Sequence, residues 1–435
     1  MSKSIVSVVK YEEPLESVRK VIEQSKLFEG VPKDSKIFIK PNIVFWSSSP
    51  HPKWGVITTS RVMEDVVVLL NEYGIKDITI GEGFGTPEAA EDAFKKLGYN
   101  TLKERYGVKL INTMEGPFEK IDMGCEFLVN FSSHPLKADY IISLPVLKTH
   151  SQAHVSLGLK NLKGFINIAS RKKFHSPDPQ KDLHYNVAKL ANNIPPCLTI
   201  IDGIYTLERG PAMDGKAHRS DILIASKDIL SADIVGAKML GLEPSTVPSL
   251  VQAAQDRNVS PDLSNIELVG DDIEPLIKPH MWDFKYNESG DLPLPFYKRQ
   301  FKGLKYRKYD TTICTYCSAI NGIMLVLLKN AWNGESFGDI EFCTGKIMEP
   351  SPGMQKTILV GQCQYNKNKD HPNINELIPI RGCPPSIDDL LDGFEHCGIT
   401  VNREIFTSGT DAGGAIFLMK YKKKPEFQES FFKIK

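Results

Sequence analysis

Four cysteines in the last third of the chain have the spacing and the surroundings of iron–sulphur ligands. Cys314 and Cys317 form a C-x-x-C pair. Cys363 follows an apolar run and a glycine, and Cys383 precedes two prolines. A cubane cluster needs about four thiolates that converge from loops with exposed backbone N–H groups, and a proline after the last cysteine fixes the turn that presents it. The pattern therefore favours a cysteine-bound cluster of the 4Fe-4S type.

Other uses of cysteine remain as alternatives. Structural zinc also takes four thiolates, but usually from two C-x-x-C pairs, and this chain has one. Disulfides fit less well, because the first residues show no basic-then-apolar secretory signal and a reducing cytosol disfavours them. Cys343 and Cys397 are spare thiols that could replace one of the four, Cys397 more readily. Cys125 and Cys197 stand alone and are predicted to be inert.

The densest group of basic residues lies between positions 148 and 163. Lys148, Lys160 and Lys163 fall within these sixteen residues, together with two histidines and Asn161. Cations beside backbone N–H groups at a glycine-bearing turn bind phosphate or carboxylate oxygens. We therefore predict that this segment binds an anionic small molecule or a second cofactor.

The two histidines of this segment, His150 and His154, are predicted to be catalytic. They are four residues apart, so on a helix they would share one face. A histidine with a pKa near neutrality suits proton transfer to a substrate that is being reduced. A metal site formed by the pair is the weaker interpretation, because no carboxylate or third imidazole lies near in sequence.

The first 280 residues alternate short apolar runs with amphipathic stretches, which predicts an α/β fold with a mostly parallel sheet. Helices are expected after Thr59 and Thr86, which have the side chains of N-caps. The predicted strands are Ser4–Val9, Lys36–Ile39, Asp77–Ile80, Tyr140–Leu144, Leu198–Ile201 and Asp221–Ala225.

Polar residues follow several of these strands at their carboxyl ends. Ligands of α/β sheets gather at that edge. Lys40 and Asn42 follow one strand, and Glu82 and Asp202 end or follow two others. We add these four residues to the predicted binding site.

The length of 435 residues predicts two or three domains. We expect an anion-binding or substrate-binding α/β domain over 1–280, a linker or strap over 281–310, and a smaller α/β iron–sulphur domain over 311–435. The chain has 53 basic and 53 acidic residues, so no global field favours nucleic acid. No apolar run approaches the ~18 residues of a membrane span, and a cytoplasmic location is expected.

The C-terminal cysteine motifs resemble the cluster-binding stretch of the small iron–sulphur subunit of respiratory complex I and its relatives in nickel–iron hydrogenases. The likeness covers about thirty residues, from G-Q-C at Cys363 to G-C-P-P-S at Cys383 and the helical pattern that follows. The adjacent cysteine pair typical of complex I is replaced here by Cys314 and Cys317. The resemblance implies a cluster more than a particular partner.

A second resemblance, to the prokaryotic domain-of-unknown-function-362 family, covers roughly the first three-fifths of the chain. It implies an iron–sulphur context but supplies no established reaction, and this chain lacks the ferredoxin-type cysteine run of many relatives. The matching motifs are Ile39-Lys40-Pro41-Asn42, Thr58-Thr59-Ser60, Gly81-Glu82-Gly83, Leu147-Lys148-Thr149-His150 and Gly158-Leu159-Lys160-Asn161-Leu162-Lys163-Gly164.

Together these features predict an iron–sulphur reductase that passes electrons from the cluster to the bound anion. The alternatives are a hydro-lyase, in which an open cluster iron acts as a Lewis acid, and a substrate-free electron carrier that docks a partner. The expected partners are an anionic small-molecule substrate and an electron-donor protein, with no nucleic acid. Homo-oligomer formation is left open.

Overall fold

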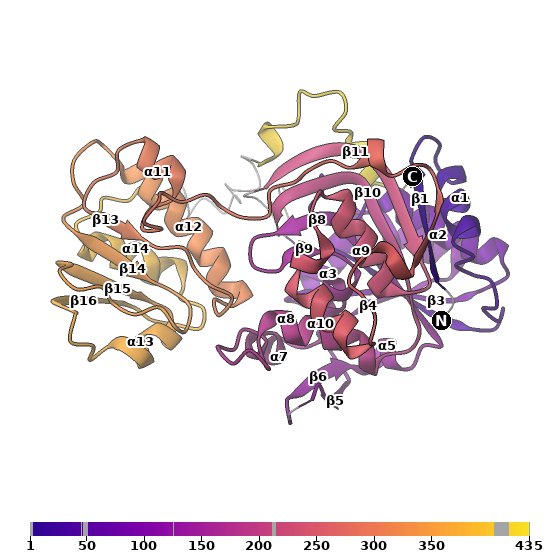
Figure 1. Ribbon diagram of the computed structural model, residues 1–435, viewed down its shortest axis with the longest axis horizontal. Helices are drawn as coiled ribbons and strands as arrows, with labels where there is room; N and C mark the ends of the chain where they lie inside the picture. The colour runs from indigo at the N-terminus through magenta and orange to yellow at the C-terminus, as the bar shows by residue number, and fades with distance from the viewer. Residues whose placement is uncertain are drawn as a thin grey trace. The chain divides into compact units, whose positions relative to one another are not determined.

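The structure, a computed structural model, describes residues 3–44, 46, 51–124, 126–210, 215–403 and 417–434. The chain divides into two compact units (Figure 1). Unit 1 comprises the described parts of 1–170, 184–283 and 413–435, and unit 2 comprises 171–183 and the described part of 284–412.

The described residues of unit 1 form a ten-stranded mixed sheet in the order β12-β1-β11-β10-β7-β2-β3-β4, with the hairpin β8–β9 beside β10. The strands from β10 to β4 in this order are parallel, whereas β11 is antiparallel to β1 and β10. All six predicted strands are confirmed, several with longer bounds. The strands are β1 Ser4–Lys10, β2 Lys36–Pro41, β3 Asp77–Glu82, β4 Lys109–Asn112, β7 Tyr140–Leu144, β8 Val146–His150, β9 His154–Ser156, β10 Cys197–Gly210, β11 Lys216–Ser226 and β12 Ile266–Gly270.

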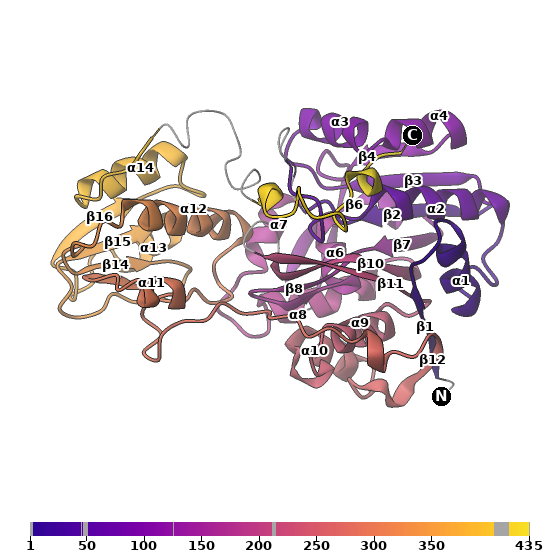
Figure 2. The ribbon, with the colours of Figure 1, turned by 90° about the horizontal axis from the view of Figure 1, so that it is seen from above.

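Helices cover both faces of this sheet (Figures 1 and 2). The two predicted N-caps are confirmed, since the hydroxyl of Thr59 accepts from the Val62 N–H and that of Thr86 from the Ala89 N–H. The helices are α1 Glu16–Gln24, α2 Ser60–Glu72, α3 Pro87–Lys96, α4 Tyr99–Tyr106, α5 Ser133–Leu136, α6 Gly158–Asn161, α7 Ile168–Lys173, α8 Leu183–Lys189, α9 Ile229–Met239 and α10 Pro248–Asp256. Short 3-10 helices occupy Leu162–Phe165, Leu190–Asn193, Pro244–Thr246, Leu263–Asn265, Glu274–Leu276 and Glu429–Phe432, and β5 (Phe118–Asp122) pairs with β6 (Leu128–Ser132).

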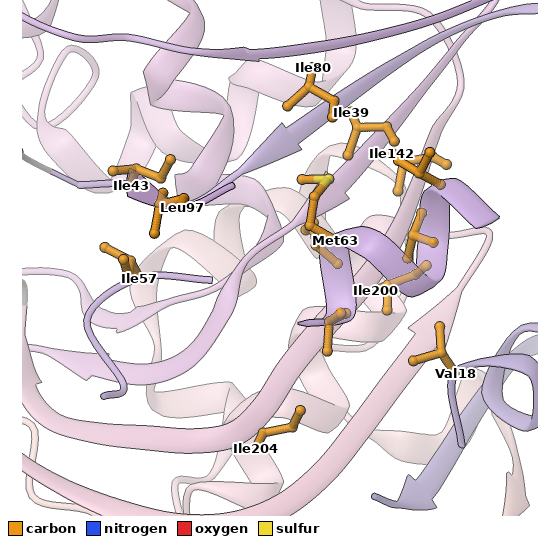
Figure 3. Close-up of a cluster of buried hydrophobic side chains, with 14 of the residues drawn as sticks. Val18, Ile39, Ile43, Ile57, Met63, Ile80, Leu97, Ile142, Ile200 and Ile204 are labelled. Atoms are coloured by element: carbon orange, nitrogen blue, oxygen red, sulfur yellow. The ribbon is translucent and has the colours of Figure 1, made fainter. Parts of the chain in front are cut away.

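Alternate side chains of the central strands fill two separate layers, because successive residues of a strand point to opposite faces. Ile37 and Ile39 join the core that α1 and α2 cover. Figure 3 shows Ile39 in this core beside the side chain of Met63 from α2. Phe38 packs instead on Phe165, with ring centroids 5.4 Å apart. Burial on both faces explains why these strands are continuous apolar runs.

Unit 2 contains a four-stranded parallel sheet in the order β13-β14-β15-β16. Its strands are β13 Leu304–Tyr306, β14 Ile340–Cys343, β15 Lys356–Val360 and β16 Glu376–Ile380, and its helices are α11 Leu294–Lys298, α12 Thr315–Ala331, α13 Gln362–Asn368 and α14 Ile387–His396. Apolar side chains of α12 and α14 pack on the same face of the sheet. The helix expected after Cys383 is present as α14, and a capping box between Ser386 and Asp389 begins it. The interval 281–310, expected as a linker or strap, contains α11 and β13.

The C-terminal segment returns to unit 1. Phe417, Tyr421 and Phe427 are buried in the same core as α1 and α2. The hydroxyl of Tyr205 donates to the carbonyl of Glu426 at 3.0 Å. We expected residues 311–435 to form one domain, whereas the described C-terminal residues 417–434 belong to unit 1. No helix among the described residues is long and apolar enough to cross a membrane.

Candidate functional site

The four predicted cluster ligands lie after strands of the unit 2 sheet. Cys314 is the N-cap of α12 and Cys317 lies in its first turn, Cys363 lies in the first turn of α13 after β15, and Cys383 follows β16. Parallel strands present their carboxyl ends at one edge of a sheet, where α/β proteins place their ligands. The sheet topology therefore places the loops that carry these cysteines at one edge.

Backbone contacts bring these loops together. The Gln362 N–H donates to the carbonyl of Gly382 at 2.8 Å, so the loops before Cys363 and Cys383 are adjacent. Gly361 has a φ of +88°, and a Cβ there would stand 3.4 Å from the sulphur of Cys317. A glycine at this position satisfies the positive φ without strain and leaves the approach to the sulphur open.

Neighbouring cysteines contribute to the pKa shifts of Cys314, Cys317 and Cys363. A hydrogen bond with Cys317 lowers the pKa of Cys314. The same bond, then burial and the charges of Cys314, Cys363 and Cys383 raise the pKa of Cys317. Burial, followed by the charges of Cys383 and Cys314, raises the pKa of Cys363 although Lys346 opposes this. Thiolates at these positions would repel one another, and a metal ion or a metal cluster would stabilise them together.

The other cysteines lie apart from this group. Cys343 and Cys397 are buried, and burial raises the pKa of each to about 12. Burial likewise raises the pKa of Cys197 to about 12. A buried neutral thiol is a poor ligand without rearrangement. Cys125 lies outside the described residues.

Four thiols are the donor set of either a cubane cluster or a single zinc ion. Among the described residues, no group of three or more His, Cys, Asp or Glu side chains is arranged to hold one metal ion. A zinc ion with Zn–S bonds of about 2.3 Å would bring its four sulphurs to roughly 3.8 Å from one another. An iron–sulphur cluster binds its thiolates to separate irons. The number and type of these side chains match the ligands that a cubane cluster requires.

A second candidate site, in unit 1, begins with a buried ion pair between Lys40 and Glu82. The ammonium lies 2.6 Å from the carboxylate, and the side chains are 1% and 4% exposed. The Lys40 ammonium also donates to the carbonyl of Pro41, and Glu82 accepts from the N–H groups of Ile43 and Gly83. A buried pair is stable only when its remaining hydrogen-bonding capacity is satisfied in this way.

Lys148 lies beside this pair and is also buried. Its ammonium donates to the side-chain oxygen of Asn42 at 2.6 Å and to the carbonyl of Val56 at 2.7 Å. Burial and the charges of Lys160 and Lys40 hold its pKa well below the ordinary value, although Glu82 acts in the opposite direction. Lys40, Asn42, Glu82 and Lys148 therefore form one network, as their positions at strand ends suggested.

The glycine-bearing turn that carries Lys160, Asn161 and Lys163 is built directly over this network. A Cβ on Gly164 would stand 2.3 Å from a methylene carbon of Lys40, so a larger residue would have to displace the paired side chains. The Asn161 amide donates to the carbonyl of Lys40 at 2.9 Å and to Ser143 at 3.2 Å. Its side-chain oxygen is buried with no hydrogen-bond partner among the described residues. Lys163 is 9% exposed, and Lys160 is partly exposed.

Two buried carboxylates tie the surrounding elements together. Asp202 accepts from the N–H of Thr59 at 2.7 Å and from that of Ile204 at 3.1 Å, and burial raises its pKa. Asp233 of α9 accepts from the N–H groups of Gly158 and Leu159, which begin the lysine turn. Asp202 was expected to contact the ligand, whereas its two oxygens bind backbone groups. Asp233 was not predicted.

His150 and His154 lie in the β8–β9 hairpin rather than on a helix, and they form a cross-strand pair. Nδ1 of His150 accepts from the N–H groups of Gln152 and Ala153, so the neutral ring carries its proton on Nε2. His154 has a φ of +61° and stacks on Trp282 with ring centroids 3.8 Å apart. The three residues between them form a hairpin turn, so the shared helical face that their spacing allowed does not exist.

The model of a protein family described as Domain of unknown function (DUF362) matches residues 37–238. A thylakoid-associated protein of Synechocystis sp. is 28% identical over 226 residues, which are 51% of this chain and 67% of that protein. Every residue of the lysine network lies inside the family match, and the four clustered cysteines lie outside it.

Two solved structures are similar at low identity. A protein from Thermotoga maritima has a TM-score of 0.35 and 14% identity over 56% of this chain and 60% of that one. The lactate racemase apoprotein from Thermoanaerobacterium thermosaccharolyticum has a TM-score of 0.32 and 12% identity over 55% of this chain and 57% of that one. This chain covers less than two thirds of either structure, and at these scores the likeness carries no conclusion about it.

The Lys40–Glu82 pair predicts a strong coupling between its two members. Lys40→Met should lower the free energy of unfolding by about 3–5 kcal/mol, because it leaves a buried carboxylate without its cation. Lys40→Met combined with Glu82→Gln should recover part of that loss, since the buried charge is then absent. Urea unfolding of the two single variants and the double variant measures the coupling.

The exposed pair of Lys109 and Asp77 on the neighbouring strands is the matched control. Lys109→Met should cost less than about 1 kcal/mol. Equal effects of Lys40→Met and Lys109→Met, or strictly additive losses in the double variant, would contradict the account.

Proposed function

We propose that this protein is an iron–sulphur oxidoreductase. Cys314, Cys317, Cys363 and Cys383 would hold a cluster of the 4Fe-4S type, and the lysine network of unit 1 would bind an anionic small molecule or a second cofactor that receives electrons. The observation that supports it most is the convergence of the cysteine-bearing loops: the Gln362 N–H donates to the carbonyl of Gly382 at 2.8 Å, and Gly361 lies against the sulphur of Cys317.

The loops of unit 2 provide what a bound cluster needs. A cluster would supply one-electron transfer. The sulphurs come from the start of α12, the start of α13 and the turn after β16. Helix starts present unpaired N–H groups and a partial positive charge, and both stabilise the negative charge of thiolates and sulphides. The cysteines left in the core, Cys343 and Cys397, have no such surroundings.

The lysines of the unit 1 site have two different roles, which depend on whether the side chain is deeply buried or lies on the turn above the Lys40–Glu82 pair. The ammonium groups of Lys40 and Lys148 donate hydrogen bonds to protein oxygens. We therefore assign them the role of positioning the turn that carries Lys160 and Lys163. Lys160 carries a positive charge at a partly exposed position of that turn. We assign it, with Lys163, the contact with the anion, because a lysine ammonium binds phosphate or carboxylate as a point charge.

The proton for the reduction would come from the hairpin. Nδ1 of His150 accepts two backbone N–H groups, which leaves Nε2 as the atom that can donate. His154 stacks on Trp282, which fixes the plane of its ring. These contacts orient both imidazoles, as proton transfer requires.

The cluster predicts a specific dependence on four cysteines. Protein purified without oxygen should contain iron and acid-labile sulphide and give an EPR signal after reduction with dithionite. Alanine at Cys314, Cys317, Cys363 or Cys383 should remove or degrade the cluster, because each supplies a ligand. Cys197→Ala is the control, and its iron content should equal that of the wild type. Stoichiometric zinc without sulphide would contradict the proposal.

The anion site predicts a selective loss of affinity for inorganic phosphate, used as the probe. Lys160→Gln should weaken phosphate binding by about 1.5–3 kcal/mol, the range for a hydrogen bond to a charged group. Lys103→Gln, on the exposed side of α4, removes the same charge elsewhere and should leave binding unchanged. Isothermal titration calorimetry gives both affinities. Equal affinities of the two variants would remove the support for this site.

A further inference from the structure

A lysine from the middle of the chain contacts one of the four clustered cysteines. The ammonium of Lys172 lies 3.2 Å from the sulphur of Cys383 and donates to the carbonyl of the same residue at 3.0 Å. It also lies 5.4 Å from the ring centroid of Tyr316, which sits between the two cysteines of the C-x-x-C pair. Lys172 is thus within reach of two of the three loops that carry the thiols.

The segment that carries Lys172 is anchored to unit 2 by further contacts. Residues 171–183 belong to unit 2, although they lie inside the family match at 37–238. The ring Nδ1 of His175 lies 2.8 Å from the carbonyl of Thr311, three residues before Cys314. Lys346 donates to the carbonyl of His175 at 2.5 Å. His175 is 1% exposed, so this segment is part of the packed unit.

The alternative is that Lys172 is an ordinary surface lysine whose contact with the thiol is fortuitous. A solvated lysine keeps its freedom of rotation and makes no lasting bond. Lys172 instead has a sulphur, a carbonyl oxygen and an aromatic ring as simultaneous neighbours. Its neighbour Lys173 is exposed, which provides a comparison within the same helix.

We propose that Lys172 is an outer-sphere residue of the cluster: its ammonium donates an N–H···S hydrogen bond to Cys383 and raises the reduction potential. This inference rests on the proposed function. Hydrogen bonds to the sulphurs and the net charge around a cluster set its potential. One added electron makes the cluster more negative, so a fixed cation stabilises the reduced state more than the oxidised state. Lys172 accordingly supplies no ligand and takes no part in proton transfer.

The test is an EPR-monitored redox titration of the full-length protein, purified without oxygen. Lys172→Gln should shift the one-electron equilibrium toward the oxidised cluster by roughly tenfold, which corresponds to a midpoint lower by about 59 mV. Lys172→Arg keeps the charge and should restore most of the wild-type potential. Lys173→Gln removes the same charge one residue away. The one-electron equilibrium constant of this variant should stay within about threefold of the wild-type value.

The outcomes distinguish the role of Lys172 from the presence of the cluster. Equal potentials for Lys172→Gln and Lys173→Gln would overturn the role of Lys172 while leaving the cluster in place. Wild-type protein without iron and sulphide would overturn the cluster itself, and the role of Lys172 with it. If Lys172→Gln loses its cluster, iron retained by Lys172→Arg and Lys173→Gln supports a charge-dependent contact. Iron lost from all three variants would overturn it.

Discussion

The ion pair between Lys40 and Glu82 is the constraint on which the arrangement of unit 1 depends. Removing two charges from water costs several kcal/mol each, and only close contact with complete hydrogen bonding offsets that cost. The pair meets this condition because β2 and β3 are parallel neighbours whose carboxyl ends lie side by side. Gly164 then packs on the pair, where a larger residue would displace the paired side chains. Three motifs far apart in sequence, I-K-P-N, G-E-G and K-N-L-K-G, thus meet at one contact.

The same contact explains what the sequence could and could not predict about this site. Strand ends are readable from apolar runs, so Lys40 and Glu82 could be placed at one edge of the sheet. Their pairing depends on the strand order and on their depth, which a single sequence does not contain. Both were therefore predicted as ligand contacts, whereas the structure shows each bound to protein groups. Asp233 was left out of the predicted site, because its role as acceptor for the Gly158 N–H comes from tertiary packing.

Hairpins and returning segments were the parts of the fold that pattern reasoning missed. The spacing of His150 and His154 is compatible with a helix, but the residues between them form the turn that joins β8 and β9. Residues 171–183 and 417–434 pack in units that sequence order does not suggest. Where such a segment packs depends on which apolar surfaces the other helices and strands leave exposed, and a single sequence does not reveal this. The cysteine group was easier, since three of its four members stand next to glycine or proline or in a C-x-x-C pair.

In unit 2, as in unit 1, functional side chains gather at the carboxyl ends of parallel strands, but here they are thiols instead of charged groups. The ends of parallel strands gather loops, and the groups that the loops carry then act on one another. In unit 1 two opposite charges meet in a buried ion pair, whereas in unit 2 loops that carry four thiols meet. The four thiols are the ligands that the proposed iron–sulphur cluster would use.

Mössbauer spectroscopy of protein reconstituted with iron-57 and sulphide tests this account most directly, because it reports the nuclearity of the iron and the ligation of each iron atom. The account predicts a spectrum of four sulphur-ligated irons in one cluster, lost when Cys363 is replaced by alanine and kept when Cys197 is replaced. A spectrum of isolated, mononuclear iron, or one unaffected by the loss of Cys363, would contradict it.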